Sequence, residues 1–159
     1  LPLRFVTRHR PASAQDLSWW TGYPITACKT AFLSLKGELQ NETIDKQEYW
    51  MLPGAQTGKP ATGLKLLSGF DEYYMGFKDK SLLLDKTFSK SMSPPNGLLP
   101  YIILLNGKIA GTWRRNIKKN CVGMEYQPFK LLTAAQQKSL KDAEKKFCKF
   151  LGLPPEQAG

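Results

Sequence analysis

The sequence predicts an α+β protein with a helical first part over residues 1–62 and an antiparallel β part with a C-terminal helix over residues 63–159. Short helical patterns with capping residues occupy the first part up to residue 36, and a hairpin pattern follows them. In the second part, the dipeptide Asn106-Gly107 joins two runs rich in β-forming residues, which is a strong hairpin signal. Apolar residues then recur at helical spacing over residues 133–152.

Composition narrows the class of protein. The chain has 159 residues, of which 42% are apolar and 23% charged, as is typical of a globular protein. No apolar run approaches the ~20 residues of a membrane span, so we expect no membrane partner. Three cysteines and one histidine lack any zinc-site spacing, so we expect no metal, no cofactor and the reduced thiols of a cytoplasmic protein. The chain begins at Leu1 and not at Met, so we expect a missing amino-terminal region among its partners.

Two helices are expected at the start of the chain. Residues 1–9 fit the end of a first helix. Ser13 is a suitable N-cap for a second helix over residues 14–20, with Asp16 completing a capping box. The inward-facing residues of this second helix are expected to be Leu17 and Trp20.

A third helix is expected to begin at Pro24, followed by a hairpin whose strands flank a polar tip over residues 41–47. This order of helices and hairpin is that of a winged helix, in which the third helix enters the major groove and the wing contacts the backbone. A three-helix packing unit or a protein-docking module has the same pattern. The residues expected to face DNA are Thr26, Lys29, Thr30 and Lys36 on the third helix and Lys46 on the wing.

The second part follows a linker rich in Gly, Pro and Thr over residues 53–63. The strand and turn pattern of this part predicts an antiparallel meander, which we interpret as a small β-barrel-like domain. The expected strands cover residues 64–67, 100–105, 108–115 and 121–126, with a loop over residues 90–97.

Alternation along the strand that ends at Arg115 places Trp113 and Arg115 on one face and Arg114 on the other. Trp113 is expected in the core. At least one arginine is then available for a phosphate, although an ion pair with Asp71 or Asp79 is the alternative. The basic residues expected to grip DNA backbone here are Arg114, Arg115, Lys118 and Lys119.

Two carboxylates, Asp71 and Glu72, are weak candidates for general acid or base chemistry. The alternative is ion pairing with Lys78, Lys80 or the arginine pair. No nucleotide-binding, hydrolase or metalloprotease motif is present.

The clearest element is the last helix, which Thr133 caps with Gln136 as its capping-box partner and Gly152 ends. Its lysines lie mostly away from the apolar face, so they form either a solvated surface or a phosphate-facing one. They are Lys138, Lys141, Lys145 and Lys149.

The basic charge is uneven. Residues 1–62 carry seven basic and five acidic residues, a net charge of +2, whereas residues 63–159 carry 16 and eight, a net charge of +8. A strongly basic protein binds phosphate backbones by counterion release, so double-stranded DNA is the expected partner. The second part is the stronger candidate for this anchoring.

Two stretches resemble a known family. The first, HRPASAQDLSWWTGYPITACKTAF, is similar to the second winged helix of the bacterial winged helix DNA-binding proteins that include the AlkZ-like DNA glycosylases. The second, LLSGFDEYYMGFKDKSLLLD followed by LLNGKIAGTWRR, resembles the carboxy-terminal half of the same family. These blocks cover about residues 5–130. The family often has Arg-Pro where this sequence has Pro100-Tyr101, which puts a backbone contact in question.

The resemblance implies tandem winged helices followed by a β-barrel-like domain, and DNA binding in repair. Some members cleave the N-glycosidic bond of alkylated or crosslinked purines with a Gln-x-Gln or Gln-x-Asp motif. The eight glutamines of this chain form neither pattern. Three hypotheses stay open: a DNA-binding module, an active glycosylase in which Asp71 or Glu72 positions the water, and a winged-helix scaffold that docks a protein.

Overall fold

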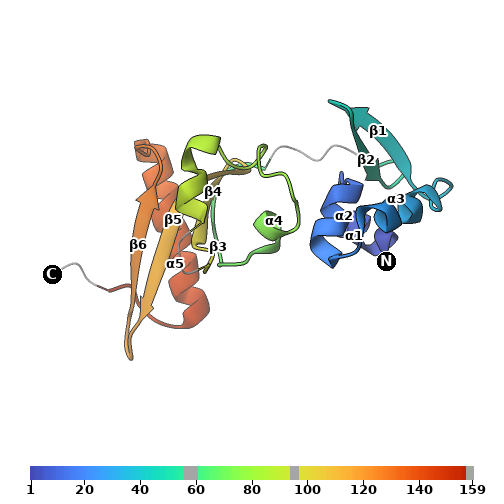
Figure 1. The fold of residues 1–159 in the computed structure, drawn as a ribbon. Helices are drawn as coiled ribbons and strands as arrows, with labels where there is room; N and C mark the ends of the chain where they lie inside the picture. Colours follow the sequence, from blue (N-terminus) through green and yellow to red (C-terminus); the bar gives the residue numbers. More distant parts are fainter. Residues whose placement is uncertain (56–60, 94–96, 157–159) are drawn as a thin grey trace. The chain divides into compact units, whose positions relative to one another are not determined.

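A computed structural model describes residues 1–55, 61–93 and 97–156 (Figure 1). The chain divides into two compact units. The first unit contains Leu1–Gly58 and Glu72–Lys80, and the second contains Lys59–Asp71 and Ser81–Gly159. The domain boundary at residue 62 stays a prediction, and the segment Glu72–Lys80 packs with the elements that precede it.

The first unit consists of helices around a small aromatic core. Phe32 and Trp50 are buried there and stack with ring centroids 5.4 Å apart. Backbone hydrogen bonds between Ala12 and Trp50 attach the segment before the second helix to the hairpin. The elements are α1 (Pro2–Arg8), α2 (Ala14–Thr21), α3 (Ile25–Leu33), β1 (Gln40–Ile44), β2 (Gln47–Met51) and α4 (Glu72–Met75).

The predicted second helix is confirmed, including its cap. The Ser13 side chain accepts a hydrogen bond from the Asp16 N–H, and the Asp16 carboxylate accepts from the Ser13 N–H. Leu17 is buried as expected. The expectation for Trp20 is wrong, because 46% of this residue is exposed and its indole N–H donates to Glu72, far along the chain.

The hairpin is longer than the sequence predicts. β1 and β2 pair from Gln40 opposite Met51 to Ile44 opposite Gln47, so the turn consists of Asp45 and Lys46 alone. The predicted polar tip was too wide because every residue of β1 is exposed and gives no apolar alternation. Both turn residues have positive φ, 49° and 65°, a conformation that costs energy for residues other than glycine.

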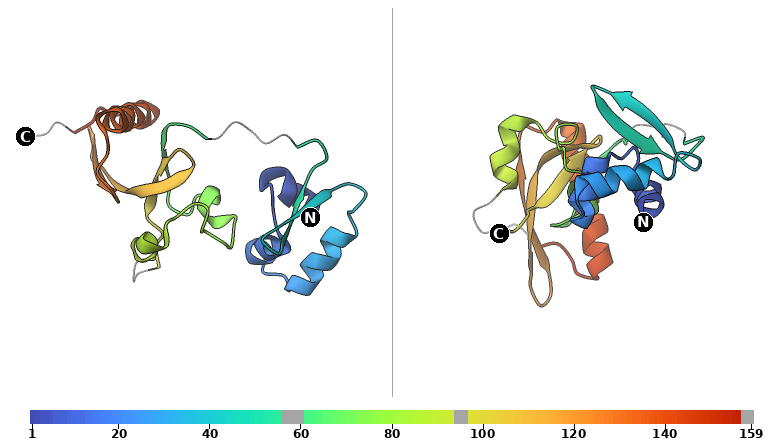
Figure 2. Two further views of the ribbon diagram at one scale, coloured as in Figure 1. Left: turned by 90° about the horizontal axis from the view of Figure 1, so that it is seen from above. Right: turned by 45° about the vertical axis from the view of Figure 1, so that its right-hand side comes forward.

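The second unit is a four-stranded antiparallel sheet covered on one face by a helix (Figure 2). The helix contacts the sheet through Phe147, whose ring meets that of Trp113 edge-on at 5.2 Å. The elements are β3 (Leu64–Leu67), the 3-10 helix η1 (Lys86–Met92), β4 (Tyr101–Leu105), β5 (Lys108–Ile117), β6 (Val122–Pro128) and α5 (Ala134–Leu151).

The expected barrel is not confirmed. The strand order is β3-β4-β5-β6, and β3 and β6 form the two edges of an open sheet among the described residues. Residues near Pro155 pair with Val122 in β6, which covers one end of that edge.

Local signals in this unit predict its turns and its helix well. The hairpin at Asn106-Gly107 is confirmed, with both residues at positive φ. The capping box of α5 is confirmed, and Gly152 ends the helix at a φ of 68°. The predicted loop over 90–97 begins inside η1, and residues 94–96 lie outside the described part. Within the described ranges, no helix is long and apolar enough to cross a membrane.

Candidate nucleic-acid interface

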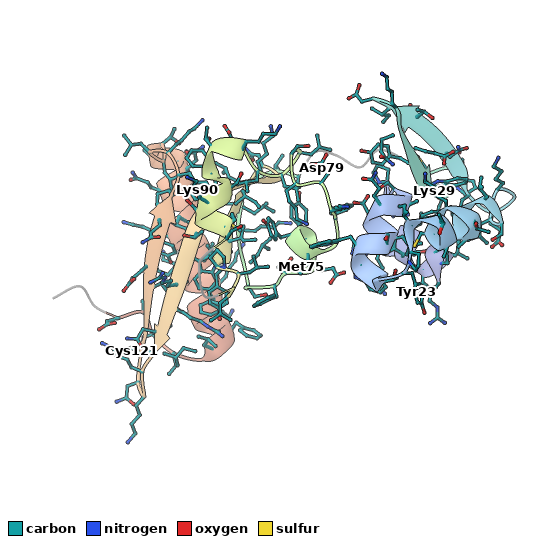
Figure 3. The ribbon with its side chains drawn as sticks, viewed as in Figure 1. Tyr23, Lys29, Met75, Asp79, Lys90 and Cys121 are labelled. Atoms are coloured by element: carbon teal, nitrogen blue, oxygen red, sulfur yellow. The ribbon has the colours of Figure 1, made fainter. Side chains whose placement is uncertain are left out.

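The predicted contact residues of the first unit all lie at its surface. Lys29 is exposed on α3 (Figure 3), together with Thr26 and Thr30. The Thr30 hydroxyl donates to the Thr26 carbonyl at 3.1 Å, so part of its hydrogen-bonding capacity is used within the helix. Lys36 is exposed in the turn after α3, and Lys46 is exposed in the β1–β2 turn.

Sequence reasoning did not include the arginines of α1. Arg4 and Arg8 are exposed, and their four-residue spacing puts them on one face of the helix. Phe5 and Val6 hold α1 in the core of the first unit. In the sequence, two arginines four residues apart with the apolar pair Phe5-Val6 between them indicate a helix with one buried face and one basic face. Arg10, just after α1, is exposed too.

In the second unit, the predicted basic residues lie on a protruding hairpin. Beyond Trp113, β5 pairs only with β6, and Arg114–Ile117 are exposed. Figure 1 shows this part of the hairpin extending past β3 and β4, and Figure 3 places Cys121 near its end. Lys118 and Lys119 are exposed in the connection between the two strands.

Arg115 is positioned by aromatic rings. Its guanidinium carbon lies 5.3 Å from the ring centroid of Tyr101 and 5.7 Å from that of Phe147. Trp113 also contacts Phe147, so the prediction that Trp113 and Arg115 share a face is confirmed. A guanidinium held against rings keeps its N–H donors for other partners, and its planar fork suits a phosphate.

Nearby carboxylates divide the four basic residues of the hairpin. Lys118 forms an ion pair with Glu156, which raises the pKa of the Lys118 ammonium. Arg114 lies directly opposite Glu125 in the strand register. Among the described residues, Arg114, Arg115 and Lys119 form no ion pair with a carboxylate, so Lys118 is the cation of the hairpin that must exchange a partner to bind an anion.

The net charge differs more between the two structural units than between residues 1–62 and 63–159. The first unit carries eight basic and seven acidic residues, a net charge of +1. The second unit carries 15 basic and six acidic residues, a net charge of +9. Almost all of the excess positive charge therefore belongs to the sheet and α5.

Of the two catalytic candidates, Glu72 has clear partners. Its Oε1 accepts a hydrogen bond from the Trp20 indole N–H at 2.6 Å and pairs with His9 Nε2 at 2.9 Å. These partners differ from the expected lysines and arginines. They fix the carboxylate, although 58% of the Glu72 side chain is exposed. Asp71 is half-buried and belongs to the second unit, and a catalytic role for either residue stays a prediction.

His9 is the centre of this cluster. Its side chain is 9% exposed, and its ring stacks on Phe5 at 4.5 Å and meets Phe77 edge-on at 5.8 Å. Its Nδ1 is buried and has no hydrogen-bond partner among the described residues. Because Phe77 and Glu72 belong to the segment Glu72–Lys80, these contacts attach that segment to α1 and α2.

The thiols are separate from each other. Cys28 and Cys148 are buried and Cys121 is half-buried, and all three are free. Burial raises the pKa of the Cys148 thiol. In the described ranges, no group of three or more His, Cys, Asp or Glu side chains has an arrangement that could hold a metal ion.

Comparison with known proteins identifies the family of this chain and a solved structure with a similar fold. The family model described as DNA glycosylase AlkZ-like matches residues 1–150. The chain belongs to the AlkZ-like DNA glycosylase family. The solved structure of Streptomyces sahachiroi DNA glycosylase AlkZ matches it with a TM-score of 0.75 and 19% sequence identity. That match covers 96% of this chain and 43% of the Streptomyces protein, so this AlkZ-like chain spans less than half of its length. No curated protein matches the chain significantly.

Proposed function

We propose that this AlkZ-like chain is a double-stranded DNA-binding module in which the second unit supplies most of the electrostatic attraction. The observation that carries the proposal is the net charge of +9 on the second unit, with Arg115 exposed and ring-stacked on the protruding hairpin. Neutralising phosphates with lysine and arginine releases counterions, and this supplies most of the non-specific binding to DNA. Family membership supports DNA as the polyanion.

The first unit is proposed to act as a winged helix with α3 as the recognition helix. The exposed Thr26, Lys29 and Thr30 on α3 and Lys46 on the β1–β2 turn support this role. A helix in the major groove contacts base edges, whereas phosphate contacts fix its position. With a net charge of only +1, this unit adds contacts to a complex that the second unit holds in place.

The test compares variants in duplex binding by fluorescence anisotropy. Lys29→Ala combined with Arg115→Ala is expected to weaken binding at least tenfold and to reduce the log–log salt slope by about one unit for each phosphate that the variant no longer neutralises. Lys86→Ala combined with Lys90→Ala is the matched control, because it removes the same charge from η1. Equal affinity of the Lys29/Arg115 variant and the parent would contradict the proposal.

A second candidate function is base excision, which the family membership favours. Glu72, held by His9 and Trp20, is the carboxylate with a defined position for activating water. Incubation with duplex containing alkylated purines tests this directly. Release of base that Glu72→Gln abolishes supports it. No release by the parent chain, or release that survives Glu72→Gln, rejects Glu72 as the group responsible.

A further inference from the structure

One row of cations on α5 lies apart from the basic residues of α3, the wing and the β5–β6 hairpin. Lys138, Lys141, Lys145 and Lys149 follow one another at intervals of three or four residues, so they form one stripe along the helix. At 1.5 Å per residue the stripe is about 17 Å long. All four side chains are exposed. We call these four residues the α5 lysine stripe.

The stripe points away from the sheet because the opposite side of α5 is already packed. Leu140 and Cys148 are buried, and Phe147 meets Trp113 of β5. Phe147 lies half a turn of the helix away from Lys138 and Lys145 by residue count. The view along α5 in Figure 2 shows the helix lying on one face of the sheet with its other side uncovered by elements of the second unit.

Among the described residues, the carboxylates of α5 form no ion pair with the stripe. Glu144 accepts a hydrogen bond from the Tyr126 hydroxyl at 3.0 Å and is therefore turned towards β6. Asp142 lines a groove of about 580 Å³ between β3 and α5. In the part of the chain that the structure describes, no member of the stripe forms an ion pair. Lys118, in contrast, is paired with Glu156.

The spacing of three stripe residues adds a small repulsion to the helix. Like charges four residues apart destabilise a helix, and Lys141, Lys145 and Lys149 follow this spacing. An extended polyanion would relieve the repulsion by placing phosphates along the stripe. An amphipathic helix that binds membranes needs a free apolar face, whereas Leu140, Phe147 and Cys148 of α5 are turned into the second unit and Phe150 alone of its large apolar residues is widely exposed.

We infer that the α5 lysine stripe is a second binding surface for the phosphate backbone of double-stranded DNA, separate from the contacts predicted on α3, the wing and the β5–β6 hairpin. The inference rests on the proposed DNA-binding function and extends the contact surface to a face that is not used by the recognition helix or the hairpin. Phosphate contacts of this kind add affinity without sequence preference.

The test replaces the whole stripe by glutamine, K138Q/K141Q/K145Q/K149Q, because glutamine keeps helix propensity and length. A control variant, K86Q/K90Q/K108Q/K130Q, removes the same net charge from lysines elsewhere in the second unit. Circular dichroism and thermal unfolding establish that both variants fold.

Duplex affinity is measured by anisotropy over a range of salt concentrations. If the stripe neutralises two or more phosphates, its variant lowers the log–log salt slope by about 2 or more, whereas the control variant is expected to change it by less than about 1. In the parent complex, lysine-labelling footprints are expected to show protection of the stripe and not of Lys86 or Lys90.

Other outcomes overturn the inference and separate it from the proposed function. If the stripe variant binds like the parent while Arg115→Ala weakens binding, the stripe is only a solvated surface and the DNA-binding function stands. Equal reductions of affinity in the stripe and control variants indicate an effect of net charge alone. If the stripe variant loses binding only to vesicles of anionic phospholipid, the surface is a membrane contact. If the parent does not bind duplex at low salt, both proposals fail.

Discussion

Asp16 connects two distant parts of the first unit, and its removal is expected to be costly. The residue is 5% exposed. Its Oδ2 accepts hydrogen bonds from the Ser13 N–H at 2.9 Å and the Ser13 hydroxyl at 2.7 Å. Its Oδ1 accepts from the Lys78 N–H at 2.8 Å. One carboxylate therefore holds the start of α2 and the segment Glu72–Lys80 together.

The magnitude follows from these three bonds. A hydrogen bond to a charged group contributes about 1.5–3 kcal/mol, and a buried donor left without an acceptor costs about 1–3 kcal/mol. Asp16→Ala leaves the Ser13 and Lys78 N–H groups without this acceptor. We therefore expect the free energy of unfolding of the first unit to fall by about 3–5 kcal/mol. Asp16→Asn is expected to lose less, because one amide oxygen can still accept.

Urea unfolding followed by tryptophan fluorescence measures this change, since Trp19, Trp20 and Trp50 belong to the first unit. Gln136→Ala is the comparison, followed through Trp113 of the second unit, whose ring contacts Phe147 of α5. Gln136 completes an exposed capping box in which its Oε1 accepts one hydrogen bond from the Thr133 N–H. Its expected cost is about 1 kcal/mol or less. A destabilisation by Asp16→Ala no larger than that by Gln136→Ala would refute the reasoning.

Three further predictions concern other residues. Gly76→Ala would place a Cβ 2.6 Å from His9 Nε2, so we expect a destabilisation of about 1–3 kcal/mol by urea unfolding, and an unchanged midpoint would contradict the packing. Lys46→Gly relieves a φ of 65° and should raise the unfolding free energy by up to about 1 kcal/mol; a lower stability would count against strain in this turn. Burial, with Glu144 second, raises the pKa of the Tyr126 hydroxyl above its usual 10.0. The neutral Tyr126 hydroxyl therefore contributes fully to stability below about pH 10, and this contribution is lost as the pH rises through the folded-state pKa. Tyrosinate absorbance that shows all tyrosines ionising together near pH 10 would disprove this.

Elements with local signals were predictable from the sequence. The capping boxes at Ser13 and Thr133 place the starts of α2 and α5, and Asn106-Gly107 places the turn between β4 and β5. Each signal depends on residues within four positions of each other, so it is readable without knowledge of the fold. Alternation along β5 likewise placed Trp113 and Arg115 on one face.

Features that depend on distant partners were not predictable. α4 has four residues and no period of its own, and its place is set by bonds such as that from the Trp19 indole N–H to the Met75 carbonyl at 2.8 Å. Trp20 faces outward for the same reason, since Glu72 lies 52 residues away. In the candidate interface, the predicted DNA-binding residue Lys118 is already paired with Glu156. These two residues lie 38 positions apart, so no local pattern indicates the pair.

The most direct measurement of the central claim is the affinity of the parent chain for a short duplex between about 50 and 200 mM salt. Attraction led by the second unit predicts detectable binding at low salt that falls steeply, with a log–log slope of about −0.9 for each phosphate neutralised. No binding at low salt, or an affinity independent of salt, would contradict a DNA-binding role for the basic surface and would favour a protein-docking function of the first unit.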